Sequence, residues 1–130
     1  MSAPEPMQYI ENKTYDEIAV GDHAELTRTL KPQDIELFAV MSGDVNPAHV
    51  DAEYAKTDMF HGVIAHGMWG GALISAVLGT ELPGPGTIFL NQSLTFEAPV
   101  VSSLDAKRCA ARASSCPRSI CMSKARNMPG

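Results

Sequence analysis

The chain has 130 residues and a mass of 13.9 kDa, which is the size of one domain. Hydrophobic residues make up 45% of the sequence and charged residues 19%, with 10 Gly and 9 Pro, so collagen-like, coiled-coil and wholly disordered chains are excluded. The formal net charge of −5 lacks the basic excess with which nucleic-acid-binding proteins neutralise phosphates. We therefore expect a globular domain that binds no nucleic acid.

Charge is distributed unevenly along the chain. Residues 1–100 hold 4 basic and 14 acidic side chains, whereas residues 101–130 hold 6 basic side chains and only Asp105. All cysteines of the sequence lie in the second part, at Cys109, Cys116 and Cys121. We therefore expect a domain over residues 1–100, followed by an atypical basic tail rich in Cys, Ser and Ala over residues 101–130.

Cysteine usage and the N-terminus both favour the cytoplasm. An odd number of cysteines without C-x-x-C spacing favours neither a disulfide framework nor a zinc site. Residues 1–6 lack the basic and apolar regions of a secretory signal. Residues 59–80 carry no Asp, Glu, Lys or Arg, but His61, His66 and five glycines interrupt them, so we expect no membrane span.

The first predicted elements are a strand and a helix. Partial alternation predicts a strand over residues 23–30. A helix follows, because Pro32 suits the first helical position and Asp34 places negative charge near the positive end of the helix dipole. The residues at helical spacing on one stripe are Ile35, Phe38, Ala39 and Ser42. Gly43 is placed to end the helix, and the Asn46-Pro47 step predicts a loop over residues 43–49.

The second half of the domain predicts a buried helix and a strand. Residues 51–57 indicate one or two helical turns, and residues 67–79 are apolar nearly all round, which predicts a fully buried helix. After turn residues 81–86, alternation predicts a strand over Thr87–Phe96. The side chains expected on its core face are Ile88, Leu90, Leu94 and Phe96. Beyond Pro99 only residues 119–122 hint at a strand.

A carboxylate and an imidazole stand five residues apart, at Asp44 and His49. A loop stiffened by proline can direct both into one pocket, where they could polarise a shared water and return a proton without a metal. The alternative is an ordinary turn that ends a helix. Asp44 would then bond nearby backbone N–H groups, and His49 would merely start the next turn.

Two strings of residues resemble a known family. They are SGDVNPAH at residues 42–49 and FHGVIAHGM at residues 60–68, which together resemble the MaoC-like hydratases, the (R)-specific enoyl-CoA hydratases (hydratase 2). The resemblance covers roughly residues 10–100. It implies an α+β hot-dog fold, in which a curved antiparallel sheet wraps a long buried helix, here residues 67–79. It also implies reversible hydration of trans-2-enoyl-CoA to (R)-3-hydroxyacyl-CoA, with an acyl-CoA thioester as substrate, no cofactor, and a homodimer.

The resemblance also implies roles for single residues. Asp44 and His49 match the catalytic pair that holds the added water. Asn46 and Gly67 match substrate-binding or oxyanion positions: Asn46 would help to fix the loop, and the Gly67 N–H would stabilise enolate charge at the start of the buried helix.

Two other histidines have alternative interpretations. His66 could be a second catalytic histidine or a capping and packing residue. His61 could be imagined as a metal ligand together with His49 and Asp44, but nothing resembles a zinc signature, so we expect no metal.

The tail departs from the family pattern. Family members continue with strands that close the sheet, whereas residues 101–130 resemble translation in a shifted frame, a chain cut short, or a divergent tail. An open sheet would leave an unpaired edge. The alternatives to a hydratase are therefore an inactive acyl-CoA-binding or dimer-forming hot-dog remnant, and a hot-dog acyl-CoA thioesterase.

Overall fold

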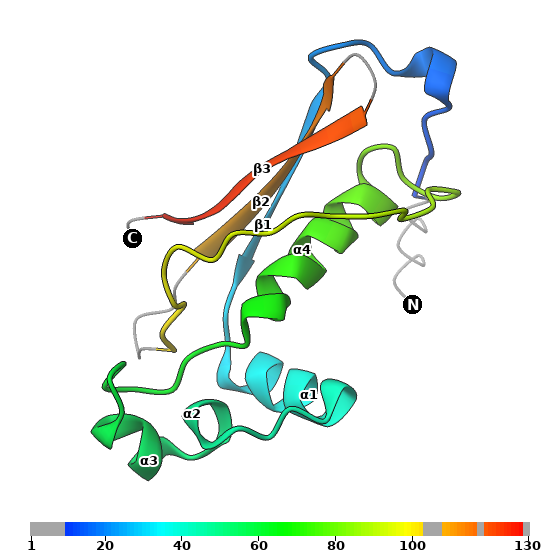
Figure 1. The fold of residues 1–130 in the computed structure, drawn as a ribbon. Helices are drawn as coiled ribbons and strands as arrows, with labels where there is room; N and C mark the ends of the chain where they lie inside the picture. Colours follow the sequence, from blue (N-terminus) through cyan, green and yellow to red (C-terminus); the bar gives the residue numbers. More distant parts are fainter. Residues whose placement is uncertain (1–9, 103–107, 117–118, 129–130) are drawn as a thin grey trace, which may run out of the picture.

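The computed structural model of the protein describes residues 10–102, 108–116 and 119–128, with side chains through residue 102. The N-terminal residues 1–6 and the cysteine side chains discussed above lie outside this description. The elements are, in chain order, η1 (Tyr15–Glu17), β1 (His23–Thr29), α1 (Pro32–Ser42), α2 (Pro47–Val50), α3 (Ala52–Thr57), α4 (Gly67–Thr80), β2 (Arg108–Cys116) and β3 (Ser119–Met128). Figure 1 shows α4 lying along the sheet, with α1, α2 and α3 grouped at one end.

The strands form one antiparallel sheet with the order β1-β2-β3. Leu26 of β1 lies opposite Ala111 of β2, and Ala113 of β2 lies opposite Met122 of β3. The register between β2 and β3 shifts between Ala110 and Arg112, which marks a bulge. Because α4 contacts both β1 and β2, the sheet and the helix form two packed layers.

The core lies between α4 and the elements around it. Val77 is fully buried, and the core cluster consists of Leu30, Ile35, Ala65, Trp69, Leu73, Ile74, Val77 and Leu78. The predicted long helix is confirmed over Gly67–Thr80. Its complete burial is not, because Met68, Ala72 and Ser75 are exposed on the face turned away from the core. Apolar composition alone did not show that one face stays uncovered.

Helix α1 confirms the prediction made from its end signals. Pro32 occupies the first helical position, and the Asp34 carboxylate accepts the Lys31 N–H at 2.9 Å. The helix ends at Gly43, which has a φ of 75° and donates its N–H to the Ala39 carbonyl at 2.9 Å. A left-handed residue at this position favours glycine, so the chain turns sharply just before Asp44.

The loop predicted over residues 43–49 is shorter than expected. Helix α2 begins at Pro47, because proline suits the first helical position and the Asn46 side chain caps the turn by accepting the Ala48 N–H at 3.0 Å. The helical turns predicted after it are confirmed as α3. The Asp51 side chain caps α3 by accepting the N–H groups of Glu53 and Tyr54.

The strand predicted over Thr87–Phe96 is wrong, because these residues form no strand in the structure. The predicted core face is also largely exposed: Ile88 is 78% exposed and Leu90 is 87% exposed, while Leu94 alone of the four packs against the core cluster. Alternation shows which side chains can share a face, but a strand also needs a hydrogen-bonded neighbour. The described part of the chain supplies no such neighbour for these residues.

The tail has more strand than its composition indicates, although the hint of a strand at residues 119–122 is confirmed within β3. Its backbone forms β2 and β3, which pair with each other, and β2 pairs with β1. Small and polar residues can be accommodated in an antiparallel ladder, because the ladder is made by backbone N–H and C=O groups. Sequence periodicity reports how side chains are buried, so it missed this pairing.

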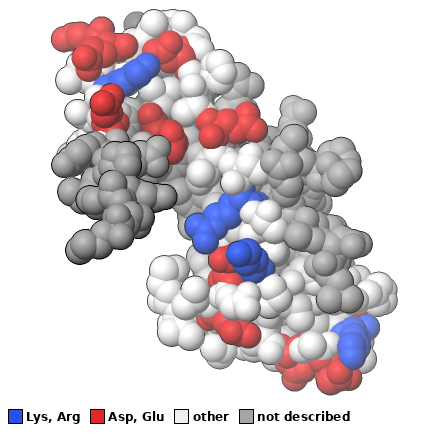
Figure 2. Space-filling model, turned by 180° about the vertical axis from the view of Figure 1, so that it is seen from behind, with Lys and Arg blue, Asp and Glu red and all other residues white. Residues whose placement is uncertain are grey.

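Charged groups on the described surface are mixed in sign, as Figure 2 shows for one face. Ion pairs join Lys13 to Asp22 at 3.6 Å, Arg28 to Asp34 at 3.3 Å and Lys56 to Glu53 at 2.6 Å. No helix among the described residues combines the length and the apolar character needed to cross a bilayer.

Candidate active site

Asp44 lies in a tight turn between α1 and α2. Its N–H donates to Ser42 Oγ at 3.2 Å, and its Oδ1 accepts the N–H of Asn46 at 3.2 Å. The turn-like bonding of Asp44 to a nearby N–H, which was the alternative interpretation of this motif, is therefore present. It engages one carboxylate oxygen and leaves the second without a hydrogen-bond partner among the described residues. Asp44 can therefore stabilise the turn through Oδ1 and still use its other carboxylate oxygen in catalysis.

His49 lies in α2 and is held by a longer-range contact. Its Nδ1 donates to the Ile64 carbonyl at 2.8 Å, and the Ile64 N–H returns to the Ala48 carbonyl at 3.3 Å. A carbonyl oxygen only accepts, so the proton of the neutral ring lies on Nδ1 and Nε2 is left as an acceptor. The imidazole is fixed in the tautomer that can receive a proton through Nε2.

Three side chains converge at this point. One carboxylate oxygen of Asp44, one ring nitrogen of His49 and one ring nitrogen of His66 all lie within 4.8 Å of one another. Asp44 is exposed, His49 is half-buried and His66 is buried. The structure thus brings together Asp44 and His49, the two residues predicted as a pair, and adds His66 as a third.

His66 packs in the site but does not cap α4 with its side chain. Its ring stacks on that of His49 with centroids 3.9 Å apart, and the Phe38 ring lies 4.8 Å away. Its Nε2 donates to the Asp44 carbonyl at 2.8 Å. The packing role is confirmed; His66 is also the N-cap residue of α4, and its carbonyl accepts the Trp69 N–H at 3.0 Å, but its side chain makes no cap hydrogen bond. Sequence spacing gave no sign of a contact to a residue 22 positions earlier.

Asp44, His49 and His66 also form a group of residue types that could hold a metal ion, with His66 instead of His61 as the third member. His61 is exposed, with a φ of 53°. The rings of His49 and His66 stack with only 27° between their planes, and ring lone pairs lie in those planes. One nitrogen of each ring already donates to a backbone carbonyl, so each ring has one nitrogen left as an acceptor. The absence of a metal stays a prediction.

Gly67 is the first residue of α4. The first N–H groups of a helix lack acceptors within it, so this end offers donors and partial positive charge beside the His66 ring. A Cβ at residue 67 would lie 3.2 Å from the Phe96 ring, so only glycine fits without a shift of that ring.

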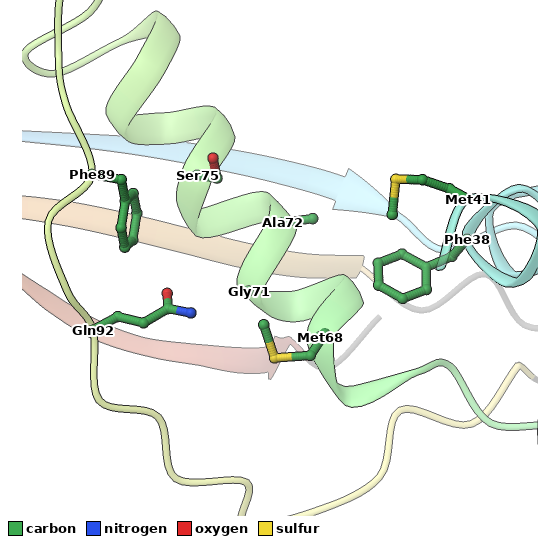
Figure 3. A pocket seen from close by; sticks show the side chains of 8 residues that line it. All are labelled: Phe38, Met41, Met68, Gly71, Ala72, Ser75, Phe89 and Gln92. Carbon is green, nitrogen blue, oxygen red and sulfur yellow. The ribbon is translucent and has the colours of Figure 1, made fainter. Parts of the chain in front are cut away.

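An open cavity of about 310 Å³ lies along the outer face of α4 (Figure 3). Phe38 and Met41 of α1 border it at one end, whereas Phe89 and Gln92 come from the segment after α4. The remaining lining residues are Met68, Gly71, Ala72 and Ser75 of α4. Because Phe38 also contacts the His66 ring, this mostly apolar cavity adjoins the cluster of Asp44, His49 and His66.

Comparison with known proteins identifies the family. The family described as the MaoC like domain matches residues 17–107. The chain belongs to this family. Over 86 residues it is 55% identical to the (R)-specific enoyl-CoA hydratase of Rhodospirillum rubrum, a match covering 66% of this chain and 60% of that protein. It is 42% identical to the 3-hydroxybutyryl-CoA dehydratase of Methylorubrum extorquens, covering 66% and 55%.

A solved structure agrees with these relatives. The unliganded R-hydratase of Pseudomonas aeruginosa matches this MaoC-like chain with a TM-score of 0.74 and 48% identity, covering 79% of this chain and 64% of that one. The α+β hot-dog fold implied by the resemblance is confirmed. The chain spans 55–60% of the length of these two relatives.

Proposed function

We propose that this MaoC-like chain catalyses the reversible hydration of trans-2-enoyl-CoA to (R)-3-hydroxyacyl-CoA, using a water held by Asp44 and His49. The observation that carries the proposal is the convergence of the Asp44 carboxylate and a His49 ring nitrogen within 4.8 Å, on a turn fixed by hydrogen bonds. The names of the relatives, an (R)-specific enoyl-CoA hydratase and a 3-hydroxybutyryl-CoA dehydratase, support this reaction and its reverse.

The chemistry follows from two acceptors that face one water. An ionised Asp44 and the Nε2 of His49 can each accept one of its protons, which directs an oxygen lone pair at C3 of the enoyl group. As the C3–O bond forms, one acceptor takes a proton and the C2=C3 electron pair moves toward the thioester oxygen. The Gly67 N–H would stabilise that developing charge. The proton taken from water is then passed to C2, which restores the thioester, so H and OH are added overall and the protein is unchanged.

The cavity beside the cluster fits the acyl part of such a substrate. Its walls are mostly aromatic, thioether and alkyl groups, which favour an apolar chain over a charged one. Phe38 lies between this cavity and His66, so a chain held in the cavity would place its thioester end near the polar cluster. We propose the cavity as the acyl site.

Conservative variants test the proposed pair. Asp44→Asn keeps an oxygen for the Asn46 N–H but loses the charge, and His49→Gln removes the imidazole. Each should lower kcat for crotonyl-CoA hydration by about 10²- to 10⁴-fold, because acid-base catalysis is lost. His23→Gln is a matched control, since His23 is exposed in β1, and its ring Nδ1 lies 3.4 Å from the Gly21 carbonyl, away from Asp44 and His49. If hydration survives both site variants, the assignment is wrong.

The same assay separates the other candidate activities. A thioesterase would release free CoA thiol, so thiol release without loss of the double bond would indicate hydrolysis instead of hydration. A remnant would bind acyl-CoA and leave it unchanged. The expected product is 3-hydroxyacyl-CoA with its thioester intact.

We also propose that two copies of the chain form a homodimer. Residues 87–96 expose large apolar side chains, including Ile88, Leu90 and Phe96, and solvent-exposed apolar groups of this size favour association. Sedimentation velocity at micromolar concentration should show a species of twice the chain mass. A 13.9 kDa species alone would contradict the dimer. The cytoplasmic location stays a prediction.

A further inference from the structure

His66 occupies the junction between the proposed catalytic turn and α4. The residue is 3% exposed, and it immediately precedes Gly67 at the start of the helix. Its ring contacts the site in two ways: the Nε2–H reaches the Asp44 carbonyl at 2.8 Å, and the ring face stacks on His49 at 3.9 Å. One side chain thus contacts both members of the proposed pair.

Packing alone does not explain a histidine here. The Asp44 carbonyl accepts the Nε2–H, so the neutral ring has an acceptor at Nδ1. Among the described residues, His66 Nδ1 is the one fully buried polar side-chain atom without a hydrogen-bond partner. Burying an unpaired polar atom costs free energy, which an apolar ring of similar shape would avoid. The stacking on His49 and Phe38 could be made by phenylalanine, whereas the Nε2–H bond could not.

We infer that His66 is a positioning residue, which holds the Asp44 turn through its Nε2–H and the His49 ring through stacking. This inference rests on the proposed hydratase function. The side-chain and turn bonds of Asp44 involve neighbours in its own exposed turn, Ser42 and Asn46, so they shape the turn without fixing it relative to α4. The His66 bond links that turn to the helix whose first N–H groups would face the thioester.

Loss of the His66 contacts should lower kcat more than it weakens substrate binding. Loss of the Nε2–H should let the Asp44 turn shift relative to His49 and Gly67. A displacement of about 1 Å in such a constellation can cost about 10²-fold in rate. The acyl cavity lies mainly along α4 and α1, so substrate affinity should change little.

Two replacements of His66 separate the hydrogen bond from the packing. His66→Phe keeps an aromatic ring and removes the donor, and His66→Gln keeps an amide N–H at about the position of Nε2 and removes the ring. The same two replacements at exposed His23 serve as matched controls. The readouts are kcat and KM for crotonyl-CoA hydration, together with Tm.

For His66→Phe we expect kcat to fall about 10²-fold with KM within about threefold and Tm unchanged or higher, since the unpaired nitrogen is gone. His66→Gln should recover about tenfold or more of that loss, because its amide can donate to the Asp44 carbonyl. Full activity in His66→Phe, or His66→Gln as slow as His66→Phe, would overturn the positioning role. Inactive wild-type protein would instead overturn the proposed function itself.

A spectroscopic measurement covers the case in which the variants do not fold. Nitrogen-15 NMR of the wild-type histidines should show His66 as a single Nε2–H tautomer, because one ring nitrogen donates to a carbonyl and the other is buried. Rapid averaging between the two tautomers would overturn the inference, whatever the activity.

Discussion

Asn46 connects the two proposed catalytic side chains through local backbone bonds. Its N–H donates to Asp44 Oδ1, and its own side chain caps the turn of α2 that carries His49. Asn46→Ala removes the cap and should cost about 1 kcal/mol of stability and lower kcat. Asn46→Asp keeps an acceptor at the cap and should retain more of both. Thermal unfolding and crotonyl-CoA kinetics measure the two effects.

The two Asn46 variants also test whether Asn46 binds substrate. If the Asn46 amide N–H₂ donated to substrate, Asn46→Asp would be as damaging as Asn46→Ala while its Tm stayed normal. Equal losses of activity in the two variants would contradict a role confined to the turn.

For single residues, the sequence predicted a functional role where the residues involved are close together in the chain. Asp44, Asn46 and His49 lie within one helix end and one capped turn. Their spacing left an ordinary turn open, and the resemblance to the MaoC-like hydratases favoured their convergence. The role of His66 was not predictable, because its decisive partner is a backbone carbonyl 22 residues earlier that carries no sequence signal.

Two adjacent glycines in α4 give a matched test of helix packing. A Cβ at Gly70 would meet nothing within 4 Å, whereas one at Gly71 would lie 3.0 Å from Met68 Cε and 3.5 Å from Leu94 Cδ1. Gly70→Ala should therefore stabilise the protein by about 0.5–1 kcal/mol, because alanine favours the helix and restricts the unfolded chain. Gly71→Ala should gain less, or lose stability, because Met68 must move.

Denaturant unfolding of both glycine variants under identical conditions decides this point. If Gly71→Ala were stabilised as much as Gly70→Ala, the close packing of Met68 and Leu94 over this turn of the helix would be contradicted.

Helices were more predictable than strands for a physical reason. The ends of α1 and α4 follow from local features: Pro32, Gly43 and the turn after residue 80. A strand depends on a partner elsewhere in the chain. Residues 87–96 have strand composition and no ladder, whereas β2 has weak strand composition and pairs on both sides.

The tail is the feature of the whole molecule that differs most from the rest. The family match ends at residue 107, close to the change from acidic to basic composition after residue 100. A shifted reading frame, a chain cut short and a divergent native tail are the alternatives for residues 101–130, and the pairing of the tail as β2 and β3 favours a native tail. If the frame is shifted instead, the nucleotide sequence should show, one base out of frame after codon 100, a continuation with alternating strand-like residues and fewer cysteines. If the alternative reading frames contain stop codons or lack the alternation of a strand, the tail is native.

The fate of crotonyl-CoA in the presence of the purified wild-type chain tests the central claim most directly. Asp44, His49 and Gly67 would add water across the double bond with the thioester intact, and the measurement is chiral analysis of the product formed over time. We predict conversion to (R)-3-hydroxybutyryl-CoA up to the equilibrium ratio, and the same ratio when the reaction starts from that product. Unchanged crotonyl-CoA, free CoA thiol, or the (S) product would contradict the account.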